Sequence, residues 1–182
     1  MNLYEILDTK MDIKLVSSHS NSNYITYQTV LNDTTYKCEF DKLDLYQIKD
    51  ILVNTLDVVL TSDFDLKYDD DIISDEHAKQ LQYIKSNISK YKNLWLLSFY
   101  YMDNDDESNF DLTNKYIASK VFGFVKQSFE MFKQTKKIKF ICFESNSVKR
   151  TNLYKKFLTK FLNIKTTIEI NHKNKTFIIM EI

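Results

Sequence analysis

Apolar and polar positions alternate in two neighbouring stretches near the N-terminus. Residues 24–30 and 35–40 are rich in β-branched and aromatic residues, and a short polar break separates them. Alternation with a period of two is typical of strands that bury one face, and Asn and Asp suit the tight turn of a hairpin. The pattern predicts a β-hairpin that turns near Asn32 and Asp33, after a short apolar segment at 13–16.

Two helices are predicted after this hairpin. Asp44 is a plausible N-cap for the first, and Ser74 or Asp75 for the second, which runs over roughly 75–92. The acidic stretch between them, residues 62–76, is predicted to be a loop. Each helix has apolar residues at three- and four-residue spacing, which predicts one buried face. These residues are Leu45, Ile48, Leu52, Leu56 and Val59 in the first helix, and Ala78, Leu81, Ile84 and Ile88 in the second.

The second half of the chain predicts the order strand, helix, strand, helix and hairpin. The run 94–102 is continuously apolar, as in a strand that is buried on both faces, and residues 137–144 are predicted to form a second buried strand. A polar loop at 102–111 precedes a long helix over 112–134, and another helix runs from Ser145 or Ser147 to Leu162. The inner faces of these helices are predicted to carry Ile117, Val121, Phe124, Val125, Phe129 and Phe132, and Leu153, Phe157, Phe161 and Leu162. Residues 166–171 and 176–182 form the closing hairpin.

This order predicts an α/β (α+β mixed) fold, in which a central mixed β-sheet is flanked by helices. A length of 182 residues suits one ordinary core, so a single domain over 1–182 is expected. Within it, a β-hairpin and two helices form an N-terminal portion, 1–93. A β-α-β-α-β-β portion follows over 94–182.

Composition narrows the functional classes. Basic and acidic residues balance, 25 against 25, so no overall field attracts nucleic acid or an acidic membrane. No signal peptide and no apolar run of membrane-spanning length are visible, which predicts a protein that is not secreted and has no membrane partner. Pro is absent, Gly occurs once and Arg150 is the only arginine. Such usage indicates an AT-rich genome, of a phage, a virus, a parasite or a low-GC bacterium.

No metal site is predicted. Cys38 and Cys142 are far apart and are expected to be buried free thiols. The three histidines, His19, His77 and His172, are scattered in polar positions. The clusters of aspartates at 63–71 and 103–106 lack the Gly turn and distal Glu of a calcium loop, so they are expected to be solvated loops.

The second half resembles the GCN5-related N-acetyltransferase superfamily. The stretch IKFICFES is followed by a helix with Arg150, Leu153, Tyr154 and Lys155, a pattern similar to that of divergent phage-encoded members. Ser147 and Tyr154 have the family's spacing between helix start and tyrosine. The resemblance implies acetyl-CoA as cofactor and Tyr154 as the general acid. Asn114, Lys115 and Tyr116, at the start of the long helix, would hold coenzyme A.

The loop before the long helix departs from that family. Members hold the coenzyme pyrophosphate on a Gly-rich loop at a helix N-terminus. Here the loop has no Gly, and it carries Asp103, Asp105, Asp106, Glu107 and Asp111. Like charges about 4 Å apart repel by about 4 kcal/mol at an effective dielectric constant near 20. The acidic loop therefore predicts a degenerate scaffold that binds no cofactor.

Three functions follow as hypotheses. The first is a non-catalytic structural or accessory protein of a phage- or virus-like assembly, which binds protein partners in the virion or the cytoplasm of the infected cell. The second is an acyl-CoA-dependent N-acetyltransferase with Tyr154 as acid. The third is a nucleic-acid or host-factor binding protein that uses Lys-rich segments, although the balanced charge disfavours nucleic acid. Arg150 is expected to form a structural pair with Glu144 or to bind a partner's acidic group.

Overall fold

The computed structural model describes residues 10–18, 23–66, 74–103, 106–108 and 115–182. The chain has the mixed α/β fold that the sequence predicts. It divides into two compact units, each built from two separate stretches. The first combines Met1–Asp41 with Leu96–Lys137, and the second combines Lys42–Trp95 with Ile138–Ile182. Each unit thus takes one stretch from each predicted portion, and the single domain over 1–182 stays a prediction.

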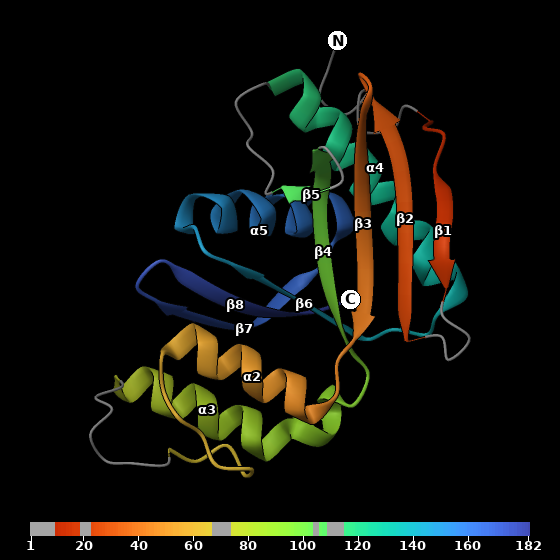
Figure 1. The fold of residues 1–182 in the computed structure, drawn as a ribbon. Helices are drawn as coiled ribbons and strands as arrows, with labels where there is room; N and C mark the ends of the chain where they lie inside the picture. Colours follow the sequence, from red (N-terminus) through yellow and green to blue (C-terminus); the bar gives the residue numbers. More distant parts are fainter. Residues whose placement is uncertain (1–9, 19–22, 67–73, 104–105, 109–114) are drawn as a thin grey trace. The chain divides into compact units, whose positions relative to one another are not determined.

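The first unit is a sheet with one long helix. Its strands are β1 (Lys14–Ser18), β2 (Tyr24–Leu31), β3 (Thr34–Lys42), β4 (Leu94–Asp103) and β5 (Asp106–Ser108). They lie in the order β1-β2-β3-β4, and β5 pairs with β4. Helix α4 (Lys115–Thr135) packs against β2, and Figure 1 shows it running behind the strands. The predicted hairpin is confirmed, because Asn32 and Asp33 both have positive φ in the turn between β2 and β3.

Aromatic rings fill the core of the first unit. Phe40 on β3 stacks on Phe132 of α4, with ring centroids 4.0 Å apart, and the edge of Tyr27 meets Phe40. The apolar stripe predicted for α4 is buried at Val121, Phe124, Val125, Phe129 and Phe132. The side chain of Ile117 and the predicted helix start at 112–114 lie outside the described residues.

The second unit is a three-stranded sheet between helices. Its elements are α2 (Leu45–Leu56), α3 (Asp75–Asn87), the 3₁₀ turn η1 (Ile88–Tyr91), β6 (Phe140–Ser145), α5 (Val148–Leu162), β7 (Lys165–His172) and β8 (Lys175–Glu181). The strand order is β6-β8-β7, with antiparallel neighbours. Figure 1 shows α5 on one face of these strands and α2 with α3 on the other. Five consecutive residues of β8, Thr176–Met180, are therefore buried.

The helix starts agree with the predicted caps. Asp44 caps α2 in a capping box, since its side chain accepts from the Gln47 N–H while the Gln47 side chain accepts from the Asp44 N–H. Ser74 caps α3, and Ser147 caps α5. Short polar side chains before an apolar repeat satisfy N–H groups that have no partner within the helix. These local signals therefore placed three helices correctly.

Several sequence predictions were wrong in detail. The supposed loop at 102–111 contains β5, which pairs Asp106 with Asp103. The run 94–102 is buried at Leu94, Trp95 and Leu97, and its later residues are only half-buried. The second helix ends at Asn87, where the 3₁₀ turn begins. Four residues that were expected inside are exposed: Leu45, Val59, Ala78 and Leu153. Val59, for example, lies beyond the end of α2, so the helical spacing no longer applies to it.

The two cysteines are buried free thiols, as predicted. In the described part of the chain, no helix is both long and apolar enough to cross a membrane.

Candidate functional site

The predicted site residues Glu144, Arg150 and Tyr154 lie close in sequence in the second unit. Glu144 is next to last in β6, and its carboxyl pKa is raised by partial desolvation. Arg150 lies in the first turn of α5, where its backbone N–H donates to the Ser147 Oγ cap. Tyr154 lies one turn further along, half-buried, with its ring edge against Phe143. The turn from β6 into α5 thus positions all three, and the pairing of Arg150 with Glu144 stays a prediction.

The hydroxyl of Tyr154 remains a proton donor. Burial raises its pKa above the ordinary tyrosine value, and the nearby charge of Arg150 opposes this shift only partly. A phenol whose pKa is raised is protonated at neutral pH and can donate a hydrogen bond. This property suits a general acid, and it suits a half-buried structural tyrosine equally well.

The residues predicted to hold coenzyme A belong to the first unit. Lys115 and Tyr116 are the first two residues of α4. Asn114 lies outside the described residues, as do Asp105 and Asp111 of the acidic loop. The described acidic residues Asp103, Asp106 and Glu107 form part of the β4–β5 hairpin. The described residues of the acidic segment therefore pair as strands β4 and β5.

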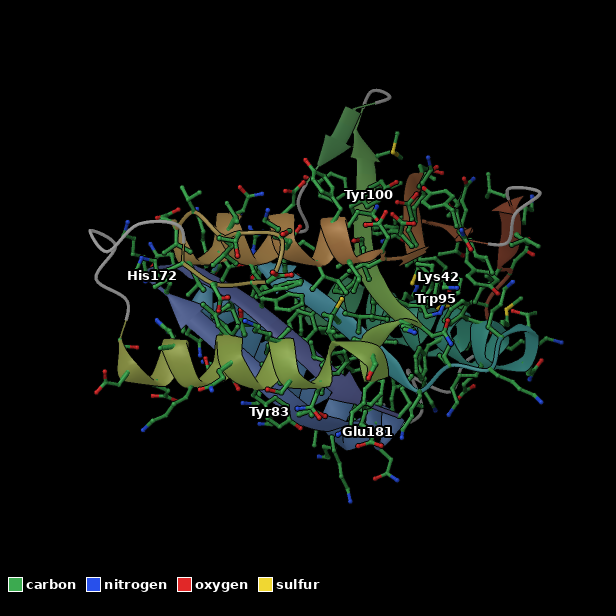
Figure 2. The ribbon with its side chains drawn as sticks, turned by 90° about the horizontal axis from the view of Figure 1, so that it is seen from below. Lys42, Tyr83, Trp95, Tyr100, His172 and Glu181 are labelled. Carbon is green, nitrogen blue, oxygen red and sulfur yellow. The ribbon has the colours of Figure 1, made fainter. Side chains whose placement is uncertain are left out.

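A second polar cluster lies on the sheet of the first unit, and the sequence did not predict it. Three hydroxyl groups donate to the same carboxylate oxygen, Oε1 of Glu39 on β3. They belong to Tyr24 and Thr26 on β2 and to Tyr100 on β4, which is labelled in Figure 2. Three strands thus orient one half-buried carboxylate, which can also accept a hydrogen bond from a cationic group.

Part of this cluster could have been found from the sequence. A turn at Asn32 and Asp33 makes Thr26 the cross-strand partner of Glu39, as the register confirms. Tyr100 lies 61 positions from Glu39 in the sequence. No local pattern indicates that contact, because it depends on which strand lies next to β3.

His77 and His172 come together although they are far apart in sequence. Their rings meet edge to face with centroids 6.0 Å apart, and Nε2 of His77 lies 2.7 Å from the carbonyl oxygen of Asn171. Figure 2 labels His172, which is the last residue of β7. His19 lies outside the described residues. Within the part of the chain that the structure describes, no group of three or more His, Cys, Asp or Glu side chains could hold a metal ion.

The open edge of the first unit exposes apolar side chains. Among the described strands, none pairs with the outer side of β1. Leu15 keeps 56% of its surface exposed, and Val16 keeps 51%. The register with β2 shifts between Leu15 and Ser17, so Val16 occupies a β-bulge. The segment before β1 also contacts β2, because the Thr29 hydroxyl donates to the Asp12 carbonyl at 2.9 Å.

No family model, curated protein or solved structure matches this chain. The resemblance to acetyltransferases stays an expectation that rests on the motifs of the chain itself.

Proposed function

We propose that this protein is a non-catalytic structural or accessory component that binds a protein partner along the outer edge of β1. The observation that carries the proposal is the exposure of two consecutive apolar side chains, Leu15 and Val16, on an edge strand. An edge strand also presents N–H and C=O groups that a further strand can pair with. An extended segment of a partner protein satisfies both features, because it adds main-chain hydrogen bonds and covers the apolar side chains.

We further propose that this partner belongs to a phage- or virus-like assembly, in the virion or in the cytoplasm of the infected cell. The support is the residue usage of an AT-rich genome: no Pro, one Gly and a single arginine. The sequence pattern around Tyr154, similar to that of phage-encoded proteins, adds to this support.

Site-specific photo-crosslinking tests the proposal in the cell from which the protein comes. A photoreactive residue replaces Leu15 in the full chain, and a matched variant carries it at Val59, which is also exposed but lies in the second unit. The expected result is a protein adduct at position 15 that is absent at position 59, with the partner identified by mass spectrometry. Equal labelling at both positions, or none at position 15, would contradict the proposal.

The alternative is an acyl-CoA-dependent N-acetyltransferase with Tyr154 as general acid. Its support is the raised pKa of Tyr154 on a helix capped by Ser147. Calorimetry of the full chain with coenzyme A tests it, together with the rate of acetyl transfer to an amine. Micromolar binding, and a transfer rate that falls in Tyr154→Phe but not in the exposed control Tyr46→Phe, would favour the enzyme. No detectable binding would eliminate it.

Binding of nucleic acid or of a host factor is a second alternative. Its support is the composition of α5, which has no acidic residue and carries Lys149, Arg150, Lys155, Lys156 and Lys160. A phosphate backbone would bind such a helix with a strong dependence on salt. Fluorescence anisotropy with a labelled DNA duplex at two salt concentrations would detect it, and the variant Lys149→Glu/Lys156→Glu would abolish it.

A further inference from the structure

The polar cluster around Glu39 lies on the face of the first unit's sheet that is turned away from α4. Side chains alternate between the two faces along a strand, and Phe40, the next residue of β3, stacks on Phe132 of α4. Glu39 therefore points to the opposite face. No described helix of the first unit covers that face, and in Figure 1 α4 runs behind the strands. Glu39 and Tyr100 are each half-buried, so the cluster is partly accessible to solvent.

The carboxylate of Glu39 has only neutral hydrogen-bond donors among the described residues. The hydroxyl groups of Tyr24, Thr26 and Tyr100 all donate to its Oε1 atom. No described lysine, arginine or histidine forms an ion pair with Glu39, although Lys37 shares the same face two positions away on β3. The half-buried negative charge is thus hydrogen-bonded but not neutralised, and a cation that reaches it would form a charge-assisted hydrogen bond.

The hydrogen bonds within the cluster determine which kind of group fits it. A carboxylate has about two lone-pair sites on each oxygen, and Oε1 of Glu39 already accepts three hydroxyl groups. Oε2 is therefore the oxygen that a ligand would use. Because each hydroxyl group directs its hydrogen to Glu39, the hydroxyl oxygens can act toward a ligand only as acceptors. A cluster that offers only acceptors selects a group that only donates, such as a primary ammonium with its three N–H groups.

An ammonium group suits this cluster better than a guanidinium group does. An arginine side chain binds a carboxylate best through two parallel N–H groups, one to each oxygen. Since Oε1 of Glu39 is already occupied by three hydroxyl groups, only one of those two bonds can form. An ammonium is a compact point charge that needs a single carboxylate oxygen, and it can direct its other N–H groups to neighbouring hydroxyl oxygens.

We infer that the Glu39 cluster binds a lysine side chain of a protein partner. The strand order places β3 between β2 and β4, so Tyr24 and Tyr100 lie on either side of Glu39, where their rings can contact the aliphatic part of that lysine. Sites for small molecules are concave, whereas a protein partner adds its own contacts around an open sheet face. Residue usage agrees, because only one of the 25 basic residues in this chain is an arginine, and a partner from the same AT-rich genome would share this preference.

Titration of the full chain with three capped tripeptides, followed by nuclear magnetic resonance, tests the inference. The probes are Ala-Lys-Ala, Ala-Arg-Ala and Ala-norleucine-Ala, which differ only in the central side chain. The backbone amide signals of Thr26, Glu39 and Tyr100 report binding at the cluster. The lysine peptide is expected to shift these signals saturably, and the arginine peptide is expected to bind more weakly. The norleucine peptide, which has no charge, should leave the signals in place.

A matched pair of variants then tests the role of the carboxylate. Glu39→Gln keeps the shape of the side chain and an oxygen that accepts the three hydroxyl groups, but it removes the charge. This variant is expected to bind the lysine peptide at least about tenfold more weakly, as the loss of one charge-assisted hydrogen bond implies. Glu130→Gln removes the same charge from an exposed position of α4 in the same unit and should leave binding unchanged.

No saturable shift with the lysine peptide would overturn the inference, and this measurement on the natural chain needs no variant. Equal binding of the norleucine or arginine peptide would also overturn it, as would binding that is unchanged in Glu39→Gln. If n-butylammonium binds as tightly as the lysine peptide, the ligand is a small amine rather than a side chain of a protein. The cluster lies on a sheet face and not at the outer edge of β1, so each of these outcomes leaves the crosslinking test of the proposed function unaffected.

Discussion

The hydroxyl of Tyr100 donates a hydrogen bond of 2.7 Å to Oε1 of Glu39, and so connects β4 to β3. The same oxygen accepts from Tyr24 and Thr26 on β2. One carboxylate thus links three strands of the first unit on one face of the sheet. The opposite face of the sheet, which packs against α4, is stabilised instead by the stacking of the Phe40 ring on the Phe132 ring. Polar and aromatic contacts therefore support the same strands from opposite sides.

Replacement of Tyr100 by Phe should lower the free energy of unfolding by about 1 kcal/mol, the typical contribution of one hydrogen bond. The ring remains, so packing changes little. Urea denaturation followed by tryptophan fluorescence measures the effect. Tyr46→Phe is the matched control, because Tyr46 is 68% exposed. Equal stability of the Tyr100 variant and the natural chain would show that the hydrogen bond contributes nothing.

Replacement of Phe132 by Ala should destabilise the chain by about 3–5 kcal/mol, since it removes a fully buried ring and leaves a cavity beside Phe40. Leu153→Ala, at a position that is 37% exposed on α5, should cost much less. Thermal denaturation of both variants compares them. A Leu153 variant as unstable as the Phe132 variant would indicate that α5 buries the face predicted from the sequence.

Asp57 should make stability depend on pH in acid. It ends α2 with positive φ, and Lys173 and Lys175 donate to its two carboxylate oxygens. Hydrogen bonds from these lysines lower the Asp57 pKa to about 2. This folded-state pKa lies below the unfolded value, which is about 3.9. The stabilisation that the Asp57 carboxylate contributes is therefore fully present above the unfolded pKa. It is lost as the pH falls through the folded pKa.

The urea midpoint between pH 5 and pH 2 measures this contribution. The Asp57→Asn variant should lose less stability than the natural chain over that interval. Asp63→Asn removes an exposed carboxylate of the same unit and should behave like the natural chain. An Asp57 variant with the natural pH dependence would indicate that the two lysines are solvated rather than paired.

Neither cysteine should react with a thiol reagent in the folded chain at neutral pH. Cys38 and Cys142 are fully buried, and burial raises the pKa of both thiols well above the ordinary value. Only the thiolate is nucleophilic, so exclusion of the reagent and suppression of the thiolate act together. Mass spectrometry after maleimide treatment should show no adduct in buffer and two in denaturant. Ser62→Cys, at an exposed position, provides the positive control.

The sequence predicted best where the signal is local. The predicted N-caps were correct at Asp44, Ser74 and Ser147, because the capping interaction involves only the next three or four residues. The predictions from the sequence were wrong where the burial of a side chain depends on residues that are far away in the sequence. Leu153 has helical spacing that fits an inner face, yet the neighbouring sheet covers other positions of α5. The short strand β5 was missed since three acidic and polar residues have no strand pattern of their own.

By itself, the sequence determined the mixed α/β class, the β2–β3 hairpin with its register, the helix starts and the buried state of the cysteines. Each depends on periodicity or on a few neighbouring residues. The tertiary structure alone decided that Tyr100 meets Glu39, that His77 meets His172 and that β1 is an edge with Leu15 exposed. These are contacts between segments far apart in the chain. The order of strands in a sheet fixes them, and no local pattern specifies that order.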